Sequence, residues 1–196
     1  MSRAMPPLAT RAREVTPGLV VLGVDPGTVR TGWGVVRRAG PSLVGVAAGT
    51  IRVNERDSLA ERLKRIHDEL AEVILTYRPT AMACEDIFYA RFPRAALQLG
   101  HARGVVLFTG AEAGLSVAGY APAIVKRSVA GRGHAEKKQL ARVVCAILGW
   151  RDLPAPDATD ALAVAITHAR AAAARIPVAP RRASRGRRAR GGWGRR

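Results

Sequence analysis

The segment that most constrains the fold is residues 19–25 (LVVLGVD), a short apolar run that ends in a carboxylate. A continuous apolar stretch of this length, closed by Pro26 and Gly27, is typical of a strand buried in a sheet. The run therefore predicts a buried strand that places its last side chain, Asp25, at the point where the chain turns sharply.

The segments that follow predict one sheet with helices around it. Residues 31–40 and 42–53 are glycine-punctuated and rich in β-formers, so with the first strand they predict an antiparallel meander. Residues 58–77 carry apolar side chains at helical spacing and open with Ser58 and Glu61, the pattern of a capping box. We expect further strands over 81–85 and 116–120, and further helices over 94–113, 122–131, 136–148 and 157–175. This order indicates a mixed α/β fold with a single central sheet.

Length and composition indicate one domain with two appended segments. The chain has 196 residues, enough for one sizeable core. We predict a flexible N-terminal extension over 1–18, a globular domain over 19–175 and an Arg-rich disordered tail over 176–196. Cys84 and Cys145 lie in apolar segments and indicate buried free thiols. No apolar run approaches the roughly 18 residues of a membrane helix, and the start lacks the apolar stretch of a secretory signal, so we expect a cytoplasmic protein without membrane contact.

The charge of the chain points to a polyanionic partner. The net charge is +17, and the eight Arg of residues 181–196 leave the rest of the chain at +9. A globular part this basic favours nucleic acid, through phosphate contacts and the release of counterions. The ordinary alternative is a soluble protein that is merely basic.

Four carboxylates stand at the junctions between apolar segments. Asp25 and Glu85 each end a predicted strand, whereas Asp157 and Asp160 lie three residues apart where the last helix begins. Residues at this spacing share one face of a helix, with Cβ atoms about 5–6 Å apart. Because strand ends of one sheet meet at one edge, a helix that crosses that edge would complete a cluster.

A cluster of this kind indicates metal-dependent phosphodiester chemistry. Carboxylates held together repel one another unless a cation lies between them, and oxygen ligands suit Mg²⁺ or Mn²⁺. Two such ions about 4 Å apart can activate a water and stabilise the leaving oxygen. Taken singly, Asp25 could be a turn residue, Glu85 a surface acid and Asp157 an N-cap. Only the set of four within a basic chain favours a nuclease.

Five motifs in order carry a family resemblance: GVDPGTVRTGWGVV, ACEDIF, LGHARG, VKRSVAGRGHAEKKQ and PDATDALAVAITHAR. Over about residues 19–172 the chain resembles RuvC, the family of bacterial Holliday junction resolvases. The resemblance implies a ribonuclease-H-like fold with a mixed five-stranded central sheet flanked by helices. It also implies a homodimer that binds a four-way DNA junction, nicks two opposing strands symmetrically and couples to the RuvA–RuvB branch-migration complex.

The resemblance also implies roles for individual residues. The metal ligands for two Mg²⁺ or Mn²⁺ ions per active site would be Asp25, Glu85, Asp157 and Asp160. Lys126 and Lys137 match basic positions near the scissile phosphate, so they join the carboxylates as candidate catalytic residues. Phe88 would stack on a base at the junction. The residues themselves suggest further phosphate contacts, since Arg91 and Arg94 are interleaved with the aromatic residues and Arg132 and Lys138 lie in or beside the glycine-flanked loop. With Lys126 and Lys137 they make up the candidate DNA contacts.

Three rival functions remain at this stage. A YqgF-type nuclease would share the fold, but the late Asp157/Asp160 pair favours RuvC. A non-catalytic architectural DNA binder would need none of the acids. An actin-like or sugar kinase would need a second D-x-G loop, and Asp25-Pro26-Gly27 is the only D-x-G sequence in the chain.

Overall fold

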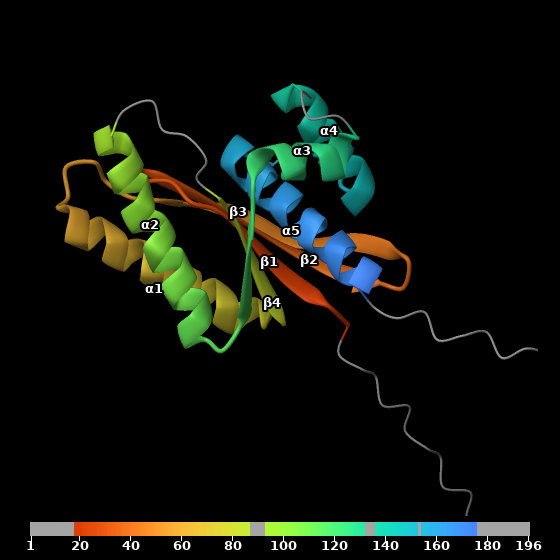
Figure 1. The fold of residues 1–196 in the computed structure, drawn as a ribbon, viewed down its shortest axis with the longest axis horizontal. Helices are drawn as coiled ribbons and strands as arrows, with labels where there is room; N and C mark the ends of the chain where they lie inside the picture. Colours follow the sequence, from red (N-terminus) through yellow and green to blue (C-terminus); the bar gives the residue numbers. More distant parts are fainter. Residues whose placement is uncertain (1–17, 87–92, 132–135, 153, 176–196) are drawn as a thin grey trace, which may run out of the picture.

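A five-stranded sheet forms the centre of the protein in a computed structural model (Figure 1). The structure describes residues 18–86, 93–131, 136–152 and 154–175. The strands are β1 (Val20–Asp25), β2 (Arg30–Ala39), β3 (Ser42–Arg52), β4 (Ala81–Glu85) and β5 (Ser116–Tyr120). Their order is β3-β2-β1-β4-β5. β1, β2 and β3 pair antiparallel, whereas β4 pairs parallel with both β1 and β5. The predicted meander and the mixed sheet are confirmed.

Helices cover both faces of this sheet. Those described are α1 (Leu59–Tyr77), α2 (Pro93–Glu112), α3 (Pro122–Ala130), α4 (Lys137–Leu148) and α5 (Pro156–Arg175). α1 and α2 lie on one face, and α3, α4 and α5 lie on the other (Figure 1). The predicted boundaries agree with these elements to within one residue, because strand period and helix caps are local signals.

Helix α1 shows how closely the sequence sets an element. The Ser58 hydroxyl accepts a hydrogen bond from the backbone N–H of Glu61, and the Glu61 carboxylate accepts one from the backbone N–H of Ser58. The predicted capping box is therefore present. The residues that α1 buries recur at helical spacing and include Ile66, Leu70 and Val73. The chain leaves the helix at Arg78, whose φ of 46° is left-handed, directly before Pro79.

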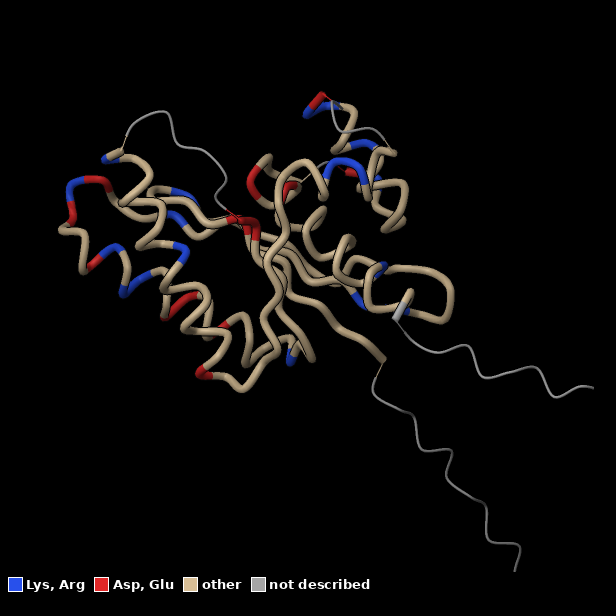
Figure 2. Tube along the Cα trace, viewed as in Figure 1, with Lys and Arg blue, Asp and Glu red and all other residues tan. Residues whose placement is uncertain are grey.

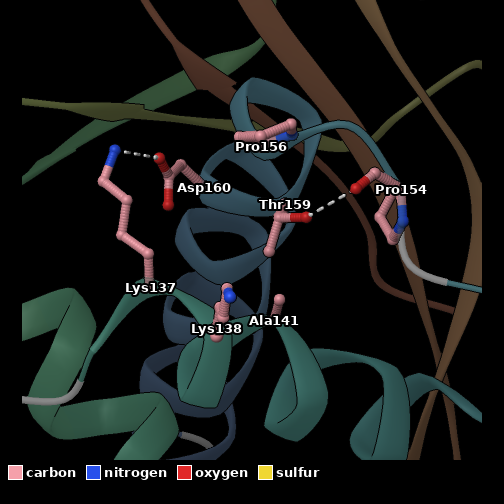
Figure 3. Close-up of a pocket in the computed structure, with 7 residues that line it drawn as sticks. All are labelled: Lys137, Lys138, Ala141, Pro154, Pro156, Thr159 and Asp160. Atoms are coloured by element: carbon pink, nitrogen blue, oxygen red, sulfur yellow. Dashed lines mark hydrogen bonds and ion pairs between the residues drawn. The ribbon is translucent and has the colours of Figure 1, made fainter.

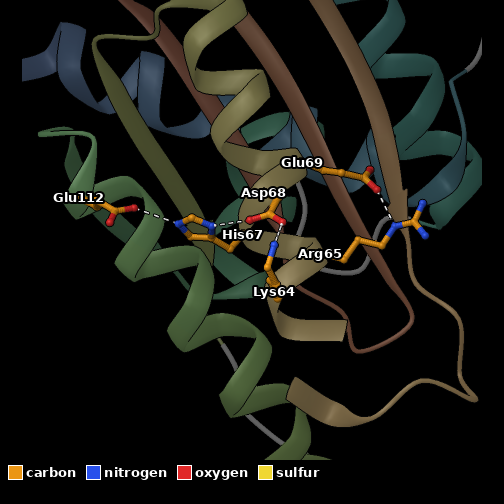
Figure 4. Close-up of polar contacts among 6 residues, drawn as sticks. All are labelled: Lys64, Arg65, His67, Asp68, Glu69 and Glu112. Atoms are coloured by element: carbon orange, nitrogen blue, oxygen red, sulfur yellow. Dashed lines mark hydrogen bonds and ion pairs between the residues drawn. The ribbon is translucent and has the colours of Figure 1, made fainter. Parts of the chain in front are cut away.

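The outer surface of α1 carries ion pairs that Figure 4 shows. Lys64 contacts Asp68 at 2.5 Å, one helical turn away. Exposed pairs of this kind contribute little to stability. Nε2 of His67 lies 2.9 Å from a carboxylate oxygen of Glu112, which links α1 to α2 and raises the pKa of His67.

The two faces of the central strands enter two different cores. Val21 and Ala83 pack with α3, α4 and α5, whereas Leu22, Met82 and Cys84 pack with α1 and α2. Since successive side chains of a strand alternate, the last residues of β1 and β4 project toward the α5 side.

Three glycines let α5 lie directly on the sheet. A Cβ at Gly23 would stand 2.1 Å from the carbonyl oxygen of Ala161, and one at Gly32 would stand 1.9 Å from that of Asp157. A Cβ at Gly34 would meet the Leu162 side chain at 2.6 Å. No side chain fits in these spaces, so the glycines set how closely the first turns of α5 approach β1 and β2.

Other predictions concern features outside this sheet. Cys84 and Cys145 are buried free thiols, as expected. Burial raises the pKa of Cys84 to about 12. Among the described helices, none is long and apolar enough to cross a membrane. Residues 1–17 and 176–196 lie outside the described residues, so the predicted extension and tail stay predictions.

Candidate active site

The four predicted carboxylates come from three elements that meet at one edge of the sheet. Asp25 ends β1 and Glu85 ends β4, and these two strands are parallel neighbours. Asp157 and Asp160 belong to the first turn and a half of α5, which packs on β1 and β2 through the glycines. In Figure 2 the acidic strand ends lie near the start of α5, and basic segments of α3 and α4 lie nearby.

The pKa of Asp25 is raised by burial and by the neighbouring carboxylates. Burial, together with the charge of Glu85, a hydrogen bond with Glu85 and the charges of Asp160 and Asp157, raises the pKa of Asp25 to about 8. A shift of this kind indicates carboxylates that share a site and a proton. The charges of Glu85, Asp157 and Asp160 therefore all act on the carboxyl of Asp25.

The pKa values of Glu85 and Asp160 are also raised, and two lysines partly offset the rise. Burial raises the pKa of Glu85 and that of Asp160 above their usual values. The positive charges of Lys126 and Lys137 act in the opposite direction on both carboxyls. The two candidate catalytic lysines thus lie close enough to influence the carboxylate cluster.

A hollow of about 200 Å³ opens between the carboxylates and the lysines. Glu85 and Asp160 line one part of it, and Lys126 from α3 and Lys137 from the start of α4 line another. Nζ of Lys137 lies 3.8 Å from Oδ2 of Asp160. A site with acids and cations side by side can hold a phosphate group against the carboxylates.

Asp86, which follows Glu85, is not part of this cluster. Its carboxylate pairs with the guanidinium of Arg103 on α2. A Cβ on Gly119 of β5 would stand 2.5 Å from Oδ1 of this carboxylate. Glu85 and Asp86 therefore project to opposite faces, as strand alternation requires.

The donor set fits a hard divalent cation. Carboxylate oxygens are the ligands that Mg²⁺ and Mn²⁺ prefer. Burial first, and the neighbouring carboxylates next, raise the pKa values of Asp25, Glu85 and Asp160. Within the described ranges, no three His, Cys, Asp or Glu side chains already stand in ligating positions around one point. The fit thus rests on the chemistry of the carboxylates and on their coupling.

The candidate DNA contacts are placed in part. Arg94 is exposed in the first turn of α2, and Lys138 is exposed in the first turn of α4. Lys138 lines a hollow together with Lys137 and Asp160, whereas within the described part of the chain no contact links Arg94 to the carboxylates. Phe88, Arg91 and Arg132 lie outside the described residues, so their roles stay predictions.

Comparison with known proteins identifies the family of this chain. A family model described as crossover junction endodeoxyribonuclease RuvC matches residues 21–168. The chain belongs to this family. RuvC of Sorangium cellulosum is 48% identical over 152 residues, which cover 78% of this chain and 85% of that protein.

Solved structures agree at the level of the fold and of the family. A structure of Thermus thermophilus RuvC in complex with Holliday junction substrate is 39% identical, has a TM-score of 0.75, and covers 79% of this chain and 94% of its own. The yeast mitochondrial Holliday junction resolvase Ydc2, 12% identical with a TM-score of 0.59, shares the fold and covers 79% of each chain. The predicted ribonuclease-H-like fold is confirmed, and the RuvC match disfavours the YqgF-type and architectural alternatives.

Sequence reasoning missed two features of this site. The ion pair of Asp86 and Arg103 joins two residues that are 17 positions apart in the sequence, and no local sequence pattern predicts it. The sequence also gave no distance between α5 and the sheet. The glycines at 23, 32 and 34 were a usable signal, since they recur on one face of two paired strands.

Proposed function

We propose that this RuvC-family endonuclease resolves four-way DNA junctions by nicking two opposing strands symmetrically, with two divalent ions at each active site. The observation that carries the proposal is the carboxylate cluster from β1, β4 and α5, which is electrostatically coupled and borders a hollow with two lysines. An acid cluster inside a basic protein suits a substrate that is held by its phosphates and cut at one of them.

The carboxylates and the lysines of the site would have different roles. Asp25, Glu85, Asp157 and Asp160 would hold the metal ions. When bound, Mg²⁺ or Mn²⁺ supplies charge that activates water and stabilises the leaving oxygen. Lys126 and Lys137 would orient the scissile phosphate in the hollow and offset the negative charge that develops on it.

The exposed face of α2 supports a homodimer. Leu97 and Phe108 on α2 are large apolar side chains, 64% and 58% exposed. Gly100 and Gly104 lie between them, and a Cβ at either glycine would meet nothing within 4 Å. These four residues fall on one helix face, where a second copy of α2 could pack closely across a two-fold axis. Two active sites related by that axis suit two symmetric nicks.

Family membership supports the cellular setting of this activity. The relatives are named crossover junction endodeoxyribonucleases. An enzyme of that kind would act where DNA recombines, and we therefore propose a cytoplasmic, nucleoid-associated protein. The same membership supports a link to the RuvA–RuvB branch-migration complex as the partner that delivers junctions.

The direct test compares a labelled mobile four-way junction with a linear duplex of the same sequence. The purified protein is incubated with each in Mg²⁺, in Mn²⁺ and in chelator, and every nick is mapped. We expect paired nicks at symmetric positions in the junction alone, and only with a metal ion. Nicks of equal rate in the duplex, or unpaired nicks in the junction, would contradict the proposal.

Dimerisation is tested separately by light scattering. The wild type should have the mass of two chains, and Gly104→Arg should shift it toward one because the arginine occupies the close-approach position. A wild type that is monomeric both free and on junction DNA would refute the dimer.

A further inference from the structure

A second hollow adjoins the one that holds the carboxylates and lysines. Its volume is about 210 Å³, and it lies between the first turns of α4 and the start of α5 (Figure 3). The residues that line it are Lys137, Lys138, Ala141, Pro154, Pro156, Thr159 and Asp160. Lys137 and Asp160 line both hollows, so the two spaces meet at this ion pair.

The walls of the second hollow are mainly apolar. Ala141, Pro154 and Pro156 offer carbon surface and no side-chain polar atom. The hydroxyl of Thr159 donates to the carbonyl oxygens of Pro154, at 3.3 Å, and Ala155, at 3.1 Å, so its donor is already used (Figure 3). Carbon surface on several sides suits a flat or cyclic carbon skeleton.

The cationic rim fits a ligand that carries phosphates. Lys137 and Lys138 stand at the opening, and both side chains are exposed. Drug-sized ligands fill pockets of about 300–1,000 Å³, so a hollow of about 210 Å³ suits one ring rather than a whole nucleotide. An apolar ring with phosphates beside it describes one nucleotide unit of a DNA strand.

We infer that this second hollow receives the base or sugar of the nucleotide next to the scissile phosphate, and that its shape decides which sequences are cut. The inference rests on the proposed function, because the shared Lys137–Asp160 pair places the hollow one step along a strand whose phosphate occupies the first. Ala141 is the specificity-determining position, since its short side chain leaves the space open. It is half-buried on α4, where a larger residue would project into the hollow.

The test compares Ala141→Val and Ala141→Leu with Ala146→Leu. Ala146 is exposed on the same helix and does not line the hollow, so its variant controls for the change in helix composition. Each protein is given a set of mobile junctions in which the bases flanking the cut positions vary systematically. Nick positions, single-turnover rates, junction affinity in chelator and the melting temperature are recorded.

We expect the Ala141 variants to bind junctions as the wild type does and to change the ratio of rates between sequences by about 10-fold or more. One methylene in a specificity pocket typically changes discrimination by about 10–200-fold. Ala146→Leu should keep the wild-type ratios. Unchanged ratios in Ala141→Val and Ala141→Leu, or an equal change in Ala146→Leu, would overturn the inference. A wild type that cuts no junction would instead refute the proposed function.

Discussion

Gly32→Ala tests whether the contact between α5 and β2 positions the carboxylates. The new Cβ would stand 1.9 Å from the carbonyl oxygen of Asp157, and ordinary van der Waals contact begins at about 3.4 Å. The backbone at Asp157 must therefore move by about 1.5 Å, and Asp160 lies on the same helical face three residues along. Since a misplacement of about 1 Å can lower a rate about 10²-fold, we expect single-turnover junction cleavage to fall by at least that factor.

Stability and binding separate this effect from misfolding. Overpacking a buried contact costs about 1–3 kcal/mol, so Gly32→Ala should melt earlier yet remain folded at 25 °C and bind junctions with wild-type affinity. Gly45→Ala is the matched control, because the three atoms nearest its Cβ would all belong to the indole side chain of Trp150, at 2.6 Å or more, and not to the backbone of α5. A Gly32→Ala protein that cleaves within about 3-fold of the wild type would refute the positioning argument, as would an equal loss of rate in Gly45→Ala.

Three further predictions concern single groups. In chelator, the pKa of about 8 for Asp25 means that the folded protein keeps a proton that the unfolded carboxyl loses near pH 4. The wild type should therefore lose stability as the pH rises from about 4 to 8, by up to about 1.4 kcal/mol per pH unit relative to Asp25→Asn. Urea titrations of both proteins across this window measure the difference, and parallel curves would contradict the coupling. Lys137→Met should slow single-turnover cleavage by about 10²-fold, whereas Lys64→Met, which removes another exposed lysine paired with a carboxylate, should leave the rate unchanged. Ser58→Ala should cost about 1 kcal/mol in thermal unfolding without changing cleavage, because it removes the cap of α1; a loss of cleavage at unchanged stability would be the opposite result.

The sequence predicted the elements because their signals are local. The apolar run before Asp25 and the capping box at Ser58 each act over a few residues, and the structure has both. The carboxylate pairing was also predictable, since parallel strands end at one edge and residues three apart share a helix face.

What the sequence could not supply are distances between elements. The contact of Gly32 with Asp157 depends on how α5 crosses the sheet, and the pairing of Asp86 with Arg103 depends on how α2 packs. The second hollow arises where α4 and the start of α5 leave space beside Ala141. These features follow from tertiary packing, which no short window of residues encodes.

The central claim is that four carboxylates from three elements act as one catalytic centre for junction cleavage. The most direct measurement is single-turnover cleavage of a mobile four-way junction in Mg²⁺ by the wild type and by four variants. The junction affinity of each protein is measured alongside its cleavage rate. These variants are Asp25→Asn, Glu85→Gln, Asp157→Asn and Asp160→Asn. We predict that each variant loses at least about 10²–10³-fold in rate, as expected for the loss of one electrostatic group, and binds the junction within about 3-fold of the wild type. Cleavage at the wild-type rate by any of the four would remove that residue from the centre, and wild-type rates in all four would contradict the account.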